Sequence, residues 1–308
     1  MVFKLKKYFI IFTLATTVFG LFCMNQVRGE EPGEETLDGV LTYSKDMLIG
    51  KKSIPNSVNK VVIKKNVKVT GSFFVPADRK TKIAFEGEDR ETSVIEGNQN
   101  TGFSWEQNSA FCINSNIQCE IKNLTSLNPR GYHVRGKEGG TQTVTKVNFI
   151  DKKQHYETNG FGGNAKVNCT NSYFDTYDDV FVIVSHGNYI GDCTIIHNKN
   201  GAPFQMGWGT QNIGSAKIRN VTVKQNAAQY NSGVISWNQK TFNEFSSRTL
   251  DIQGLKVTKS SGGSDGPVYQ MGTYNNKVNN AKVTIENFSG YKDRVKKFNG
   301  STGVFDWK

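Results

Sequence analysis

Two adjacent aspartates, Asp178 and Asp179, are the residues whose type and spacing most directly suggest chemistry in this sequence. Like charges a few ångströms apart raise the pKa of one carboxyl group, so a pair can supply one acid and one base. Cleavage of a glycosidic bond requires those two groups. The alternative interpretation is a solvated turn in which both carboxylates face water.

Four further residues near the pair are candidates for binding a substrate. Trp208 and Trp237 could stack on sugar rings, or each could fill a corner of the scaffold. Gln205 could donate a hydrogen bond to a sugar hydroxyl, or it could belong to an internal ladder of amides. Tyr177 directly precedes the acid pair and could set its environment.

The elements that must position these residues are predicted from a repeated unit of short β-branched segments ending in a polar corner. The central residues of the units are separated by 23, 25, 21, 28, 34 and 33 positions, and they are Asn123, Lys146, Asn171, Asp192, Asn220, Gly254 and Asn287. Strands and turns repeating at this spacing indicate a solenoid, in which stacked coils share one apolar core. The sequence therefore predicts an all-β fold, a single-stranded right-handed parallel β-helix of the pectin lyase-like type. A β-propeller is the alternative, although its blades need longer repeats.

The expected domain organisation has three parts. Residues 1–29 read as a secretory signal peptide, with a basic start, an apolar run from Tyr8 to Cys23 and a cut near Glu30. Residues 30–57 are polar and are expected to form a lead-in or N-terminal cap, and residues 58–308 form the β-helix domain. The apolar run is short for a membrane span, so we expect a secreted protein; an uncleaved anchor is the alternative.

The net charge and the number of cysteines limit the classes of partner and the cellular compartment that the sequence allows. The formal charge of +11 falls to +7 without the signal, because that segment carries Lys4, Lys6, Lys7 and Arg28 and no acid. The remaining lysines are scattered, and no nucleic-acid motif appears. Four cysteines remain in an exported chain, which predicts two disulfides. Four cysteines allow three connectivities, and the pairing of sequence neighbours, Cys112 with Cys119 and Cys169 with Cys193, is the one that we take as the working hypothesis. Their spacing does not favour zinc, so we expect neither a metal nor a cofactor. Five sequons predict a glycoprotein if the source is eukaryotic.

The stretch from Thr158 to Trp208 resembles the catalytic core of glycoside hydrolase family 49, the dextranase and isopullulanase group. The Asp178-Asp179 pair before the strand Val180–Val184 carries the resemblance, together with the segment Asn200–Trp208. The segment Asn231–Trp237 is also similar, and the likeness covers roughly residues 120–290. Polygalacturonases, with the same architecture and an Asp-Asp element, are a weaker match.

The resemblance implies inverting hydrolysis of α-glucan linkages by three aspartates. Asp178 stands at the family's proposed general acid and Asp179 at the adjacent carboxylate. The third family aspartate lies in a Thr-Asp-Gly element that reads Thr158-Asn159-Gly160 here, so Asn159 replaces it. An amide cannot take a proton from water, and loss of a positioned base costs on the order of 10²–10⁴ in rate.

Two hypotheses of function follow. The first is a secreted, monomeric glycoside hydrolase acting on a neutral α-glucan, with Asp178 as acid and Asp179 as base. The second is a catalytically impaired β-helix protein that binds polysaccharide, which the residue Asn159 favours. A pectin-directed enzyme would need basic residues around the acids to hold uronate groups, and residues 172–184 contain none. The same absence argues against a calcium-dependent polysaccharide lyase.

Overall fold

Successive coils of short strands build two long sheets in the computed structural model of this chain. The structure describes residues 32–153, 158–209, 214–239, 248–272, 281–286, 292–298 and 300–308. The chain divides into two units, Met1–Pro32 and Gly33–Lys308, and the strands all belong to the second. The described residues contain no helix, and hence none that could cross a membrane. The predicted signal peptide lies outside the described residues.

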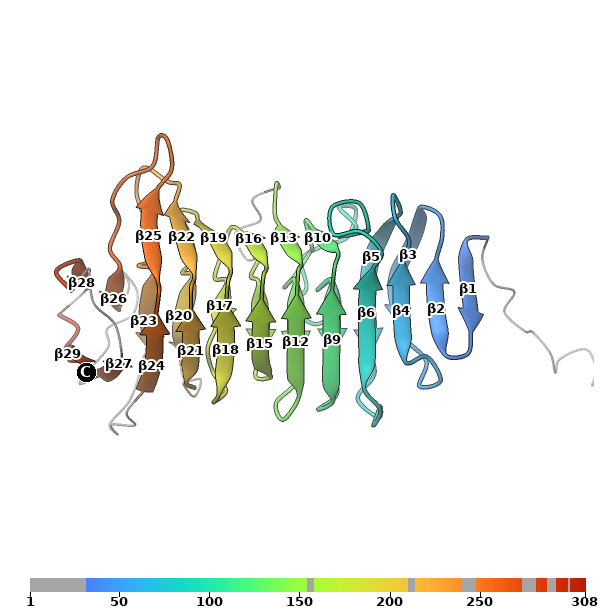
Figure 1. The fold of residues 1–308 in the computed structure, drawn as a ribbon, viewed down its shortest axis with the longest axis horizontal. Coiled ribbons are helices and arrows are strands. Elements are labelled where there is room, and N and C mark those ends of the chain that lie inside the picture. The colour runs from blue at the N-terminus through green and yellow to red at the C-terminus, as the bar shows by residue number, and fades with distance from the viewer. Residues whose placement is uncertain are drawn as a thin grey trace, which may run out of the picture. The chain divides into compact units, whose positions relative to one another are not determined.

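The strands fall into three runs, and each typical coil contributes one strand to each run (Figure 1). The first run is a 12-stranded sheet made of β1 (Glu34–Leu37), β2 (Val40–Tyr43), β4 (Lys60–Ile63), β6 (Ile83–Gly87), β9 (Gln118–Lys122), β12 (Thr141–Thr145), β15 (Lys166–Thr170), β18 (Asn188–Gly191), β21 (Ala216–Arg219), β24 (Arg248–Gln253), β27 (Ala281–Glu286) and β29 (Gly303–Trp307).

The second and third runs together form a 17-stranded sheet, because the long strands β3 (Met47–Ser53) and β5 (Lys68–Val75) join them. The second run continues through β7 (Val94–Glu96), β10 (Thr125–Leu127), β13 (Asn148–Ile150), β16 (Tyr173–Asp175), β19 (Thr194–His197), β22 (Thr222–Gln225) and β25 (Lys256–Lys259). The third run continues through β8 (Phe111–Ile113), β11 (Val134–Gly136), β14 (Phe161–Gly163), β17 (Phe181–Val182), β20 (Phe204–Gly209), β23 (Ile235–Gln239), β26 (Tyr269–Met271) and β28 (Val295–Lys297).

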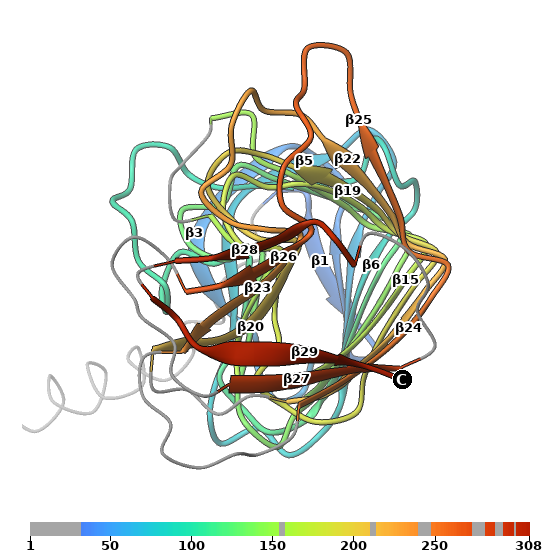
Figure 2. The same cartoon turned by 90° about the vertical axis from the view of Figure 1, so that its left-hand side faces the viewer.

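The pairing within these runs is parallel, apart from the hairpin of β1 with β2 at the N-terminal edge. Viewed along the stack, the strands of successive coils overlie one another (Figure 2). The fold is therefore all-β, with long parallel sheets consistent with a β-solenoid. A propeller would show separate antiparallel blades, whereas these ladders are parallel. The parallel pairing starts at Val40, inside the stretch expected to form a cap.

The predicted coil lengths are confirmed for five of the six steps. Residues paired along the 12-stranded sheet differ by 23, 25, 21, 28 and 34 positions, from Ile121 through Val144, Cys169, Ile190 and Ile218 to Ile252. The last predicted step of 33 is wrong, since Leu250 pairs with Ile285, 35 positions on. A difference of two leaves the inward and outward sides unchanged, because side chains alternate with a period of two.

The repeated polar residue is a corner in the left-handed region of backbone conformation. Its φ values are +55° at Asn123, +57° at Lys146 and +52° at Asn171, Asp192 and Asn220. Asparagine, aspartate and glycine adopt this conformation at the lowest cost, which explains their recurrence at the bend between the first and second runs. Asn287, assigned to the same role, lies outside the described residues.

Inward side chains fill the space between the runs. Phe161, Phe181 and Phe204 stack through successive coils, with ring centroids 5.1 and 5.9 Å apart. All three are fully buried, and each such side chain contributes about 1.5–3 kcal/mol to folding. This ladder fixes the position of the segments that enter the third run, including the one that carries Asp178 and Asp179.

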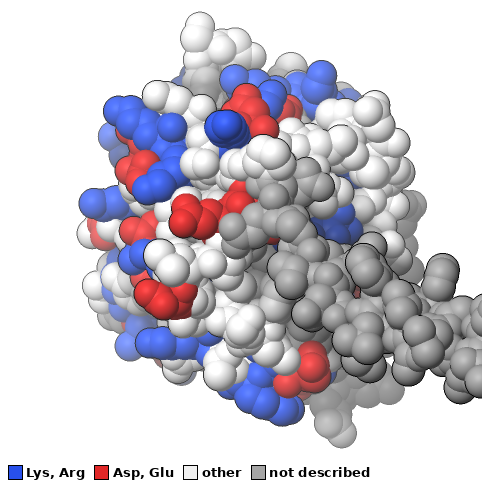
Figure 3. All heavy atoms as spheres, turned by 90° about the vertical axis from the view of Figure 1, so that its right-hand side faces the viewer, with Lys and Arg blue, Asp and Glu red and all other residues white. Residues whose placement is uncertain are grey.

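Most charged side chains lie on the outer surface, where both signs are interspersed. Lysines pair with acids in neighbouring coils, as in Lys60 with Glu86 at 2.6 Å and Lys68 with Glu96 at 3.3 Å. The view onto the end of the stack that carries β1 and β2 shows blue and red atoms interspersed around a rim (Figure 3). The positive net charge is therefore not gathered into one field on this face.

The predicted disulfides are not formed in this structure, in which the four cysteines of the described residues are free and buried. Cys112 and Cys119 lie on different sheets. Cys112 faces outward, with Phe74 and Arg135 as its neighbours in adjacent strands, whereas Cys119 belongs to the core. Opposite orientation prevents that bond. Cys169 and Cys193 both lie in the core, and the Cys193 thiol approaches the Cys169 carbonyl oxygen at 3.9 Å.

Candidate functional site

The candidate site lies on one edge of the coils, where the second run of strands passes into the third. We call this the loop edge, and its described segments are 97–110, 128–133, 151–153, 158–160, 176–180, 198–203, 226–234 and 260–268. The segments stack through backbone hydrogen bonds: His133 N–H donates to Asn159 O at 2.9 Å, and Gly160 N–H donates to Asp179 O at 2.8 Å. The same edge therefore collects residues that are far apart in the sequence.

The two aspartates and Asn159 come together on this edge. Phe161 pairs with Phe181, so the residues two positions earlier, Asn159 and Asp179, are neighbours in adjacent coils. Asp178 N–H donates to Thr158 O at 3.1 Å, which keeps the acid pair beside the Thr158-Asn159-Gly160 turn. The sequence likeness placed these three residues in one group, and the register brings them to one place.

Asp178 and Asp179 differ in environment although they are adjacent in the chain. Asp178 is partly exposed, whereas Asp179 is only 6% exposed. The Asp179 Oδ1 atom accepts a hydrogen bond of 2.7 Å from the Ala202 amide in the next coil. Burial nevertheless raises the pKa of Asp179 to about 7, because removal from water disfavours the charged form.

Glycine at position 201 lets the next coil approach the acid pair. A Cβ atom added to Gly201 would lie 2.0 Å from the carbonyl carbon of Asp178 and 2.2 Å from the amide nitrogen of Asp179. No side chain fits there, so the backbone of the next coil packs directly against the backbone of the pair. Beyond this coil the edge continues with amides, as Asn231 Nδ2 donates to Asn200 Oδ1 at 3.2 Å.

The accessory residues predicted from the sequence do not all reach this edge. Tyr177 does, and it is partly exposed beside Asp178. Trp237 is 4% exposed and belongs to the core, so the predicted stacking of a sugar ring on it does not fit its position. Gln205 is fully buried and donates to Gly207 O at 2.7 Å, which removes it from the surface. Trp208 has its backbone in β20, and its side chain lies outside the described part of the structure.

The two buried histidines closest to the loop edge are neutral. Burial lowers the pKa of both His133 and His197 to about 3. The Nδ1 atom of His133 hydrogen bonds with Ser126 Oγ at 2.8 Å, and the His197 ring packs on Tyr230 with centroids 4.5 Å apart. Neither can serve as an acid near neutral pH, and both act as packed polar core residues. Among the described residues no group of His, Cys, Asp and Glu is arranged to hold a metal ion.

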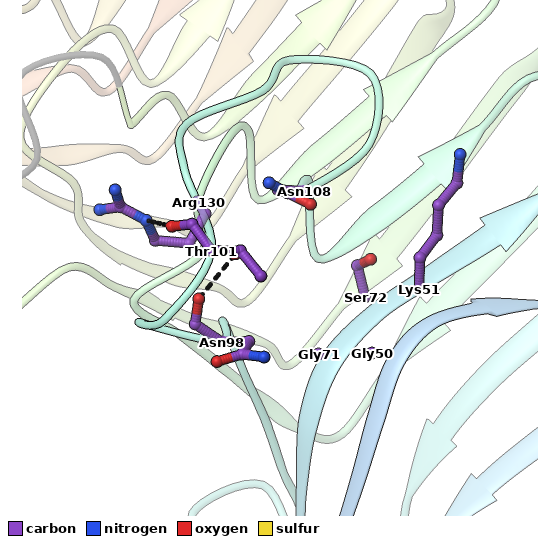
Figure 4. Close-up of a pocket in the computed structure, with 8 residues that line it drawn as sticks. All are labelled: Gly50, Lys51, Gly71, Ser72, Asn98, Thr101, Asn108 and Arg130. Carbon is purple, nitrogen blue, oxygen red and sulfur yellow. Dashed lines mark hydrogen bonds between the residues drawn. The ribbon is translucent and has the colours of Figure 1, made fainter.

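A small pocket of about 120 Å³ lies farther along the edge and is lined by Gly50, Lys51, Gly71, Ser72, Asn98, Thr101, Asn108 and Arg130. Figure 4 shows the Lys51 ammonium group and the Arg130 guanidinium group on opposite sides and pointing away from each other. The Arg130 Nε atom is used by a 3.0 Å hydrogen bond to Thr101 O. The two positive groups that line the pocket therefore do not point toward a common ligand position. The hydrogen bond from Arg130 to Thr101 joins the loop to the next coil.

Sequence reasoning missed three aromatic residues on the loop edge, Phe103, Trp105 and Tyr132. Trp105 and Tyr132 stack with centroids 4.3 Å apart, and Phe103 meets Trp105 edge-on at 4.4 Å. The signal was present, because Trp105 stands in a stretch of Gly, Ser, Gln and Asn rather than in a strand pattern. Aromatic residues in such a stretch are often surface contacts.

Comparison with known proteins found no matching family model, no similar curated protein and no similar solved structure. The assignment of function therefore rests on the site itself.

Proposed function

We propose that this chain is an exported right-handed parallel β-helix of the pectin lyase-like type that hydrolyses a neutral α-glucan with inversion. One observation carries the proposal: a buried carboxyl group with a pKa near 7 adjoins a partly exposed carboxyl group on one edge of the coils. Two carboxyl groups whose environments push their pKa values apart are the requirement for acid and base in one site.

The environments favour Asp179 as the general acid and Asp178 as the general base. A carboxyl group with a pKa of about 7 keeps its proton for a large part of the time at neutral pH and can donate it to the leaving oxygen. Asp178 is nearer to water and can accept a proton from an attacking water molecule. This reverses the roles expected from the family likeness, in which Asp178 is the acid.

Asn159 lies beside the pair and contributes an amide in place of a third carboxylate. An amide donates and accepts hydrogen bonds but does not titrate, so Asn159 would orient a sugar hydroxyl or the attacking water rather than deprotonate it. The chemistry proposed here uses no metal and no cofactor.

A polysaccharide-binding protein without catalysis is the second candidate. Two observations favour it: the amide at Asn159, and the use of Asp179 Oδ1 by the Ala202 amide at 2.7 Å. A carboxyl group that ties two coils together has a structural role whether or not it also donates a proton. Under this second proposal the loop edge binds glycan but does not hydrolyse it.

Release of reducing sugar from dextran, pullulan and polygalacturonate by residues 30–308 separates the candidates. The hydrolase proposal expects release from an α-glucan that is lost in both Asp178→Asn and Asp179→Asn, with inversion visible by NMR of the first product. Release only from polygalacturonate would contradict the substrate class. No release from the native protein, together with release from Asn159→Asp, would identify the binding protein instead.

A further inference from the structure

The aromatic residues Phe103, Trp105 and Tyr132 form a cluster outside the hydrophobic core. None of the three belongs to the core cluster, and all are partly exposed. They lie on the loop edge, where segment 97–110 is much longer than the tight connection 128–133 in the next coil. Long loops without secondary structure in a compact fold are commonly binding loops.

The pairing of the strands fixes the distance along the loop edge between the cluster and the two aspartates. Val134 pairs with Phe161, and Phe161 with Phe181, so Tyr132, Asn159 and Asp179 occupy equivalent positions in three successive coils. Adjacent strands are about 4.8 Å apart, which places the Tyr132 position about 10 Å from that of Asp179 along the edge. The cluster is therefore next to the candidate site.

A glycine makes room for the Tyr132 ring. A Cβ atom on Gly162 would lie 2.4 Å from two ring carbons of Tyr132, so the ring rests directly on the backbone of β14. Trp105 then stacks on Tyr132 with an angle of 29° between the ring planes. The rings are held by the coil beneath them and do not depend on the loop alone for their position.

The rim of the cluster is polar. Two arginines contact segment 97–110: the Arg135 guanidinium group donates to Glu106 at 3.0 Å, and the Arg130 Nε atom donates to Thr101 O at 3.0 Å. Glu106 and Gln107 are exposed beside Trp105 and offer hydrogen-bonding groups at the rim. Flat aromatic faces with a polar rim suit the apolar face and the hydroxyl edge of a pyranose ring.

We propose that Trp105, with Tyr132 and Phe103, is a stacking subsite for a pyranose ring of the same neutral α-glucan that reaches Asp178 and Asp179. This subsite rests on the proposed function for its substrate class. It adds a second sugar-binding contact about two coils away from the two aspartates. It provides binding energy and takes no part in proton transfer.

The test measures binding of dextran by affinity electrophoresis and by titration calorimetry, with the Asp178→Asn form of residues 30–308 so that no substrate is consumed. Trp105→Ala is expected to weaken dextran binding at least tenfold, and Trp105→Phe to weaken it less. The matched control is Tyr189→Ala, because Tyr189 is 37% exposed on the 12-stranded sheet, away from the loop edge; its binding should equal that of the parent. Circular dichroism and thermal unfolding confirm that each variant is folded.

The outcomes separate this subsite from the hydrolase proposal. Dextran binding that persists unchanged in a folded Trp105→Ala protein overturns the subsite, as does a parent that binds no dextran. Cleavage of dextran by the otherwise native protein with KM unaffected by Trp105→Ala would leave the hydrolase standing without this subsite. Binding that depends on Trp105 in a protein that cleaves nothing would support the subsite and reject the hydrolase.

Discussion

Gly201 lies directly against Asp178: a Cβ atom added to the glycine would be 2.0 Å from the Asp178 carbonyl carbon. The contact is backbone to backbone, so neither chain segment can yield by changing a rotamer. The next coil thereby holds the backbone of the acid pair in place.

Gly201→Ala is expected to destabilise the protein by about 1–3 kcal/mol, because overpacking of this size forces the backbone to shift. It should also lower turnover of an α-glucan, since the shift falls on the acid pair. Urea unfolding and reducing-sugar release check the two effects. Gly102→Ala is the matched control, because nothing lies within 4 Å of its Cβ position. Equal stability of the two variants would contradict the close approach.

Asp179 gives the stability of the native protein a specific dependence on pH. Its folded pKa of about 7 is above the unfolded value of about 3.9, so the folded state binds the proton more tightly between those values. The free energy of unfolding of the native protein, relative to Asp179→Asn, should therefore be highest below pH 4 and should fall as the pH rises to about 7. Asparagine keeps an oxygen for the Ala202 amide and does not titrate. The check is urea unfolding from pH 4 to 8, with Asp178→Asn as control. A difference between native and Asp179→Asn that does not change with pH would refute the burial of a protonated carboxyl group.

His133 has the opposite dependence. Its folded pKa of about 3 is below the unfolded value of about 6.5, so its contribution is present above pH 6.5 and is lost as the pH falls toward 3. The native protein should lose stability relative to His133→Gln over this range. His186→Gln is the control, because His186 is exposed. NMR titration of the His133 ring in the folded protein gives an independent readout, and a midpoint near 6.5 would show that the ring is not buried.

Arg79 joins backbone segments of the N-terminal coils through its buried side chain. It is completely buried, and its guanidinium group donates to the carbonyl oxygens of Pro55, Val58, Thr81 and Lys82. Arg79→Met is expected to cost about 3 kcal/mol or more, because it leaves several buried carbonyl groups without a donor. Lys80→Met, at the exposed neighbour, should leave the unfolding midpoint unchanged. Similar midpoints for the two variants would mean that water satisfies these carbonyl groups.

The site shows which of its residues could be predicted from the sequence and which could not. The likeness of the segment around Asp178 grouped Asp178, Asp179 and Asn159, and the register of the strands brings the three residues to one edge. The tryptophans expected to line it were chosen by their distance in the sequence, and Trp237 proved to belong to the core. Trp105 lies some seventy positions before the acids, and only the stacking of coils brings it near.

The sequence alone determined the repeat. Asn123, Asn171 and Asn220 recur where the backbone takes a positive φ, because that conformation is a local property of a few residue types. Coil length follows from their spacing, and so do the parallel strands between them. Burial, by contrast, is decided by what lies in the neighbouring coils. The tertiary structure alone set the protonation of Asp179, the separation of Cys112 from Cys119 on two sheets, and the placement of Tyr132 on Gly162, because each depends on register between segments that are distant in the chain.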